Sequence, residues 1–150
     1  MVSGTSSTLV YLIAIPLFSS AFLLLGGRAL DRIGHLIGTA ASAGSFAVAL
    51  FELNKMLGRE EESRGVTQRL FTWINVGSFQ VDATLLLDQL SICFVLLITG
   101  VGTLIHIYSI SYMSHDIDRR RFFAYLNLFI AAMLLLVLGN SNLNLYVGWE

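Results

Sequence analysis

Apolar segments of membrane-spanning length follow one another along this chain, separated by shorter polar stretches. They cover about residues 8–26, 33–56, 85–113 and 122–139, and a further one begins at 142. An α-helix rises about 1.5 Å per residue, so about 20 apolar residues cross a hydrocarbon core about 30 Å thick. The pattern predicts a single membrane domain, an all-α transmembrane helical bundle of four membrane-spanning helices and the start of a fifth (142–150 onward).

The composition agrees with a lipid environment. Of the 150 residues, 55% are hydrophobic and 13% are charged, and the mean hydropathy is +0.74. A soluble domain carries about 25% charged residues, because water must solvate its surface. The formal net charge of −1 also excludes a nucleic-acid-binding protein, which would need clustered basic residues on one face.

Residues 57–83 form the longest polar stretch and are expected to be an extramembrane loop. Within it, residues 70–74 and 78–82 are rich in β-forming side chains on either side of a turn-prone centre, which predicts a small β-hairpin. The alternation is imperfect, so an irregular loop with Trp73 at the membrane interface is the alternative. Asp82 and Asp88 are expected at the entrance of the third helix, where carboxylates complement the helix dipole.

Small residues form two ridges on the second apolar segment. They are Gly34, Gly38 and Ser42 on one, and Ala41, Ser45 and Ala49 on the other. In lipid, small residues let helix backbones approach closely and commonly mark helix interfaces. We expect packing within one bundle, with a homodimer contact as the alternative.

The distribution of basic residues predicts the orientation. Arg28, Arg32 and 119–121 lie on one side of the predicted membrane, and four basic residues lie on the other: Lys55, Arg59, Arg64 and Arg69. Cytoplasmic loops are enriched in Lys and Arg, and the arginine triplet occupies a short connector. The N-terminus and the hairpin loop are therefore predicted outside, and the 114–121 loop in the cytoplasm.

Two ionisable residues are candidates for proton transfer. Glu150 lies eight residues beyond Asn142, about 12 Å into a core about 30 Å thick. Carboxylates at such depth are expensive to ionise and are functional by default, so Glu150 is the first candidate, with a structural hydrogen-bonded acid as the alternative. His106, within the third apolar segment, is a possible relay, with a hydrogen-bonded packing histidine as the alternative.

Other chemistry lacks a signature in the sequence. There is no Gly-rich phosphate loop, no H-E-x-x-H pattern and no cysteine pair. The single cysteine, Cys93, has apolar neighbours, which predicts a buried, unreactive thiol. We therefore expect no metal, no cofactor and no redox or hydrolytic centre in this chain.

Three stretches resemble the largest antiporter-like membrane subunit of respiratory complex I, the proton-pumping NADH:quinone oxidoreductase. They are LIHIYSISYM (104–113), RFFAYLNLF (121–129) and LYVGWE (145–150), and the short stretch 88–91 is also similar. Ser111 stands where family members often have Gly. The resemblance implies a non-redox membrane subunit of a respiratory chain translocase, with FMN, iron–sulfur clusters and quinone in partner subunits. It also implies that Glu150 matches a glutamate that pairs with a lysine on a later, broken helix.

Two other readings remain at this point. The large subunit of multisubunit Na⁺/H⁺ antiporters is similar through the same segments. A short membrane scaffold or assembly protein without transport would instead end at Glu150, where a terminal carboxylate would add to the side-chain carboxylate in lipid. We expect a partial chain of the complex I subunit, in an energy-transducing membrane such as the bacterial inner membrane.

Overall fold

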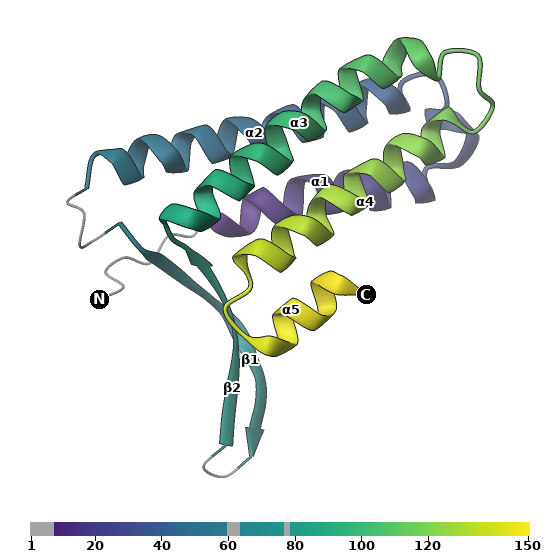
Figure 1. The fold of residues 1–150 in the computed structure, drawn as a ribbon. Coiled ribbons are helices and arrows are strands. Elements are labelled where there is room, and N and C mark those ends of the chain that lie inside the picture. The colour runs from purple at the N-terminus through teal and green to yellow at the C-terminus, as the bar shows by residue number, and fades with distance from the viewer. Residues whose placement is uncertain (1–7, 60–63, 77–78) are drawn as a thin grey trace.

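The computed structural model describes residues 8–59, 64–76 and 79–150, apart from the side chains of residues 73, 74, 76 and 79–81. The chain is mostly helical, with one two-stranded sheet (Figure 1). The elements, in order, are α1 (Leu9–Leu25), the short 3₁₀ helix η1 (Gly27–Leu30), α2 (Gly34–Leu57), β1 (Val66–Val76), β2 (Phe79–Leu87), α3 (Gln89–Tyr112), α4 (Arg119–Leu138) and α5 (Asn142–Trp149).

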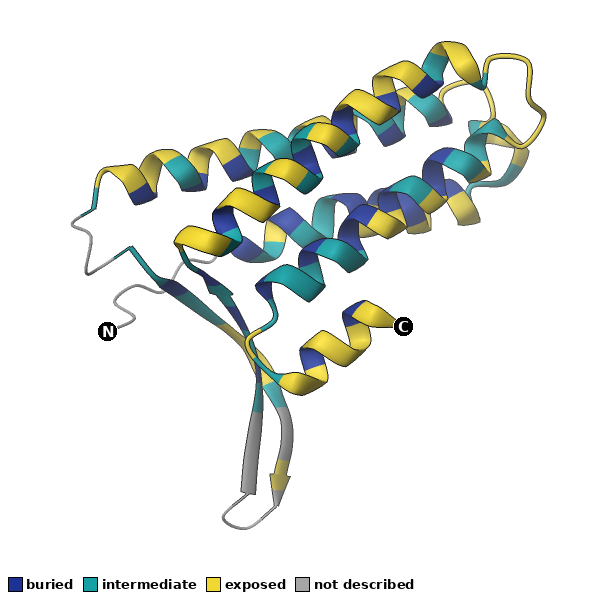
Figure 2. Cartoon of the chain, viewed as in Figure 1, coloured by how far each residue is buried: buried dark blue, intermediate teal, exposed yellow. Residues whose placement is uncertain are grey.

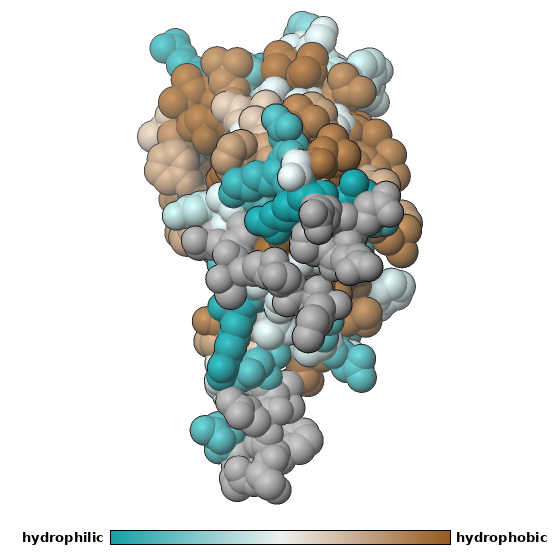
Figure 3. All heavy atoms as spheres, turned by 90° about the vertical axis from the view of Figure 1, so that its left-hand side faces the viewer, coloured by the Kyte–Doolittle hydropathy of each residue, from teal (hydrophilic) through white to brown (hydrophobic). Residues whose placement is uncertain are grey.

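Helices α1 to α4 form an antiparallel bundle, with α2 beside α3 and α1 beside α4 (Figure 1). One stripe of each helix is buried and the opposite face is exposed (Figure 2). The exposed faces are apolar as well, with Leu25, Phe18 and Leu104 exposed at 87%, 72% and 66%. Figure 3 shows hydrophobic side chains over much of the helical body and hydrophilic ones gathered near the hairpin. Such an exterior fits lipid rather than water.

Three of the described helices are long and apolar enough to cross a membrane: α2, α3 and α4. Helix α1 is also apolar but has 17 residues. The prediction of a helical membrane bundle is confirmed at this level.

The predicted β-hairpin is confirmed and is longer than expected. Its antiparallel register runs from Val66 opposite Leu87 to Val76 opposite Phe79, with two register shifts that account for the imperfect alternation. Residues 77–78, next to the predicted turn, and the side chain of Trp73 lie outside the described residues. The base of the hairpin is buried against the helices, because Val66, Leu85 and Leu87 belong to the main apolar core.

The predicted start of the third helix, at residue 85, was wrong. Residues 84–87 pair with β1 and complete β2, so helix α3 begins at Gln89. Asp88 is its N-cap, and its carboxylate accepts a hydrogen bond from the backbone N–H of Ser91 at 2.6 Å. That hydrogen bond lowers the pKa of Asp88 below its ordinary value. Asp82 is not at the helix entrance but within β2, where it pairs with Arg69 at 2.9 Å.

The small-residue ridges pack within the bundle, as expected. Gly34, Gly38, Ser42, Ser45 and Ala49 are all buried on α2. A methyl group at Gly38 would lie 3.1 Å from Cβ of Phe123 on α4, so the two backbones approach closely there.

The expected burial of Cys93 was wrong. The residue is exposed on α3, and its thiol lies 3.4 Å from the carbonyl oxygen of Gln89. Its apolar neighbours do not enclose it, because the outward face of α3 is itself apolar.

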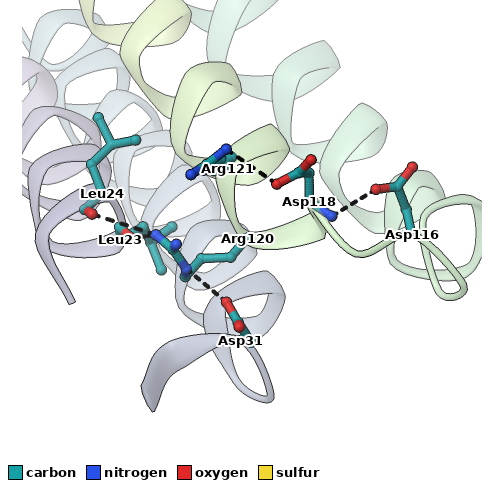
Figure 4. A network of polar contacts seen from close by, with 7 residues as sticks. All are labelled: Leu23, Leu24, Asp31, Asp116, Asp118, Arg120 and Arg121. Atoms are coloured by element: carbon teal, nitrogen blue, oxygen red, sulfur yellow. Dashed lines mark hydrogen bonds and ion pairs between the residues drawn. The ribbon is translucent and has the colours of Figure 1, made fainter. Parts of the chain in front are cut away.

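The connector end of the bundle is held by an arginine of α4. This helix begins at Arg119, three residues before the predicted start, which places the arginine triplet in its first turn. The Arg120 guanidinium donates to the carbonyl oxygens of Leu23 and Leu24 at the end of α1 and pairs with Asp31 at 2.8 Å (Figure 4). These contacts of Arg120 with α1 and the following connector stabilise a helical turn that precedes the apolar run of α4.

Candidate functional site

The buried imidazole of His106 lies where α2, α3 and α4 meet. The side chain is 0% exposed, and its Nδ1 lies 2.7 Å from the carbonyl oxygen of Gly102, one turn earlier in α3. Its Nε2 lies 3.2 Å from Nδ2 of Asn127 on α4. The ring also packs against Phe123, with centroids 5.6 Å apart.

The two partners of His106 determine its tautomer. A carbonyl oxygen only accepts hydrogen bonds, so Nδ1 carries the hydrogen and donates to Gly102. The amide nitrogen of Asn127 only donates, so Nε2 is the acceptor. This arrangement holds a neutral imidazole, whose unprotonated nitrogen, Nε2, faces Asn127 on α4.

Asn127 connects three helices and is 0% exposed. Its Nδ2 carries two hydrogens and lies within hydrogen-bond distance of three acceptors that share them: the carbonyl oxygens of Gly38 on α2 at 3.1 Å and of Phe123 on its own helix at 3.0 Å, and Nε2 of His106. Its Oδ1 is buried and has no hydrogen-bond partner among the described residues. We call His106, Asn127 and the Gly38 carbonyl the polar junction.

Sequence reasoning did not single out Asn127. The available signal was its position on the apolar face of α4, four residues after Phe123 and three before Ile130, both of which are buried. A polar side chain on a buried helical face in lipid needs hydrogen-bond partners, so its spacing alone marks an interhelical contact.

Hydroxyl groups continue the polar contacts beyond the junction. Ser42 of α2 and Thr103 of α3 lie 3.0 Å apart, and Ser45 donates to the carbonyl oxygen of Leu12 on α1 at 3.2 Å. Thr99 and Thr103 also donate to carbonyl oxygens four residues earlier in α3. These hydroxyls are satisfied within the bundle and do not titrate in the physiological range.

A cavity of about 300 Å³ lies between α3 and α4, with His106 on its wall. Its other lining residues are apolar: Leu97, Ile98, Val101, Gly102, Ile105, Leu126, Phe129, Ile130 and Met133. A cavity with so few polar groups does not hold ordered water easily, so His106 is shielded from bulk solvent.

Glu150 is exposed at the C-terminal cap of α5. It lines a groove of about 500 Å³ against α4, together with Tyr125, Leu128, Phe129, Ala132, Met133, Leu136, Gly148 and Trp149. The two predicted site residues therefore face different cavities, which share the side chains of Phe129 and Met133. The structure does not bring His106 and Glu150 into contact.

Glu52 is a second buried ionisable group that the sequence reasoning missed. It is 2% exposed on α2, three residues along the ridge from Ala49, and pairs with Lys55 at 3.3 Å. Lys55 also reaches the hydroxyl of Thr8 at 3.5 Å and lies over the Phe51 ring. The Lys55 side chain is 39% exposed, whereas that of Glu52 is 2% exposed.

Known proteins support the family resemblance. Residues 73–123 match the family described as NADH-Ubiquinone oxidoreductase (complex I), chain 5 N-terminus. The chain is 58% identical over 139 residues to NADH-quinone oxidoreductase subunit L of Mycobacterium tuberculosis and 37% identical over 139 residues to that of Escherichia coli. It is 36% identical over 139 residues to NADH-ubiquinone oxidoreductase chain 5 of Talaromyces marneffei.

These alignments cover 93%, 92% and 93% of this chain but 22%, 22% and 21% of the three relatives. The chain thus spans about a fifth of their length. The resemblance to the complex I subunit, stated above from three sequence stretches, is confirmed. Together with the apolar helices, it shows an integral membrane protein.

Proposed function

We propose that this chain is the N-terminal part of a non-redox membrane subunit of a proton-pumping NADH:quinone oxidoreductase, and that it takes part in proton translocation. The observation that supports this most strongly is the 58% identity to a subunit L over 139 residues, which are 93% of this chain. Partner subunits would supply NADH oxidation, FMN, iron–sulfur clusters and quinone reduction.

In this proposal Glu150 holds and releases the translocated proton. Its carboxyl is presented by α5, which packs on α4 so closely that a methyl group at Gly148 would meet backbone atoms of Leu136 and Ala132 at 2.8 and 3.1 Å. An ionised carboxylate in lipid costs several kcal/mol unless it is paired or hydrated. Glu150 would therefore alternate between a charged, paired state and a neutral one as a cationic partner outside this chain moves. His106 would act as a relay.

The topology follows from the same proposal. Helices α1 to α4 form one membrane domain with four spans, in which α1 crosses with about 26 Å of helix and the flanking residues. The N-terminus and the hairpin lie outside, and the 114–121 loop lies in the cytoplasm of a bacterium. Charged side chains at that connector, including Arg121 and Asp118, are exposed, as this placement requires.

Replacement of Glu150 by Gln in the complete subunit tests the function. Proton translocation and NADH oxidation are measured together in inverted membrane vesicles, and we expect a lower proton-to-electron ratio or a lower coupled turnover. Asp116→Asn is the matched control, because Asp116 is exposed in the connector. Its carboxylate accepts a hydrogen bond from the backbone N–H of Asp118, and the amide oxygen of an Asn can accept the same bond. An unchanged ratio and turnover in Glu150→Gln would refute the proposal. Sodium transport without NADH oxidation would instead indicate an antiporter.

A further inference from the structure

We propose that Asn127 is a positioning residue that keeps His106 neutral, and that proton uptake by His106 turns the Asn127 amide and releases the Gly38 carbonyl. The inference rests on the proposed role of His106 as a relay. In the step itself, Nε2 takes one proton from the preceding proton carrier of the proposed relay, which is left with one proton and one positive charge fewer, and the imidazole gains one positive charge.

With the Asn127 amide in its present orientation, the polar junction accommodates only the neutral ring. Once Nε2 carries a hydrogen, it faces the Asn127 amide nitrogen at 3.2 Å, and two donors then point at each other. The nearest unused acceptor is Oδ1 of the same side chain, which is buried and unpartnered among the described residues. A half turn of the amide brings Oδ1 to the place of Nδ2, where it accepts from the imidazolium.

The same half turn breaks contacts on the other side of Asn127. The amide nitrogen leaves the carbonyl oxygens of Gly38, now at 3.1 Å, and Phe123, now at 3.0 Å, and an oxygen faces these carbonyls instead. Helices α2 and α4 are close at Gly38, since a methyl group there would lie 3.0 Å from Nδ2 of Asn127 and 3.1 Å from Cβ of Phe123. Protonation of His106 therefore weakens the contact between α2 and α4, which couples a proton to helix spacing.

The other charged or titratable groups on the neighbouring helices lie away from the His106 ring, so Asn127 is the group that sets its protonation state. His35 of α2 packs edge-on against Phe123, and the arginines of α4 (119–121) lie in its first turn. Glu52 and Lys55 are 14 or more residues along α2 from Gly38, about 21 Å of helix. Glu150 of α5 lies on the other side of Phe129 and Met133, and α1 carries no Asp, Glu, Lys or Arg.

The test compares Asn127→Asp with Asn127→Leu in the complete subunit within its membrane complex. A carboxylate at this place accepts from the imidazolium and attracts its charge, so Asp should raise the proton affinity of His106 at least tenfold and move the pH profile of proton translocation about one unit toward alkaline pH. Leu keeps a similar volume but offers no acceptor, so it should give no alkaline shift. Adding His106→Gln to the Asp variant should abolish the shift.

If Asn127 had only a structural role, each of the two variants would lower proton translocation by the same factor at every pH, with no shift of the pH profile. This result would overturn the inference. So would a shift that persists with His106→Gln. If the variants fail to assemble, ¹⁵N-histidine NMR of the unaltered subunit decides, with the signal assigned by its loss in His106→Gln. A neutral ring protonated at Nδ1 is expected, and a ring protonated at Nε2 at neutral pH would overturn the inference. An unchanged proton-to-electron ratio and turnover in Glu150→Gln would refute the proposed function but would not alter the NMR result for His106, so the two failures can be told apart.

Discussion

Two adjacent arginines at the start of α4 make contacts of very different quality, which allows a matched stability test. Arg120 reaches the carbonyl oxygens of Leu23 and Leu24, which belong to the last turn of α1 and have no partner within that helix (Figure 4). It also pairs with Asp31 in the connector between α1 and α2. Arg121 makes one ion pair, with Asp118 three residues earlier.

The expected loss for Arg120→Leu follows from these contacts. A hydrogen bond from a charged donor contributes about 1.5–3 kcal/mol to the free energy of unfolding, and the Arg120 side chain is only 11% exposed. The bond to Leu24, at 3.5 Å, adds little. The pair with half-exposed Asp31 adds about 0.2–1 kcal/mol, so the sum is about 2–4 kcal/mol. The Arg121 pair, at 3.4 Å between side chains that are 59% and 68% exposed, contributes about 0.5 kcal/mol or less.

Thermal unfolding of the detergent-solubilised protein, followed by fluorescence-detected size exclusion, measures the difference. For about 2–4 kcal/mol in a domain of this size, the melting temperature should fall by about 4–16 °C in Arg120→Leu and by about 2 °C or less in Arg121→Leu. Both changes replace the same residue by the same residue in one helical turn, so effects of lost charge and added apolar area are matched. Equal shifts in the two variants would refute the attribution to the α1 carbonyls and Asp31.

Two further predictions concern Asp88 and Gly148. Asp88→Ala should lower the free energy of unfolding by about 1 kcal/mol at neutral pH. Because the hydrogen bond lowers the pKa of Asp88, this contribution is complete above the ordinary carboxyl pKa of about 3.9 and is lost as the pH falls through the lowered pKa, so denaturation of both proteins at pH 7 and in acid should show the difference disappearing in acid. Gly148→Val should push α5 off α4, because the added Cβ would lie 2.8 Å from a backbone nitrogen, and should lower the proton-to-electron ratio although Glu150 is intact. Val147→Leu, on the exposed side of the same helix, should leave that ratio unchanged, and equal losses in the two variants would contradict the packing argument.

The helices were predictable because lipid imposes one length scale on every span. Apolar runs of about 20 residues, interrupted by charged connectors, leave few alternatives to helices that satisfy their own backbone hydrogen bonds. The exact ends were not predictable, because tertiary contacts decide them. Residues 84–87 are apolar enough for a helix, yet they pair with β1 and are tied to the α4–α5 turn through the hydrogen bond from Asn140 N–H to Thr84 O at 3.0 Å.

The candidate site was only partly predictable. His106 and Glu150 were found because an ionisable residue is rare in an apolar run, and that signal needs no partner. Asn127 does not titrate, so the same search passed over it, and its role depends on a contact with a residue 89 positions earlier in the sequence. Glu52 was passed over for a different reason: it lies near the polar loop, and only the packing of the helices shows that its ridge is buried.

The difference between hydroxyl and amide contacts explains why one point in this bundle is suited to respond to protons. Thr99 and Thr103 donate to carbonyls of their own helix, so the loss of a neighbouring helix leaves these bonds in place. The Asn127 amide instead divides its hydrogens between α2, α3 and α4, and each of its orientations satisfies a different set of partners. A side chain with two orientations and one titratable neighbour forms a two-state element, and both a proton and the spacing of the helices can bias it. A lipid-embedded bundle with uniformly apolar packing at this point would have no such element.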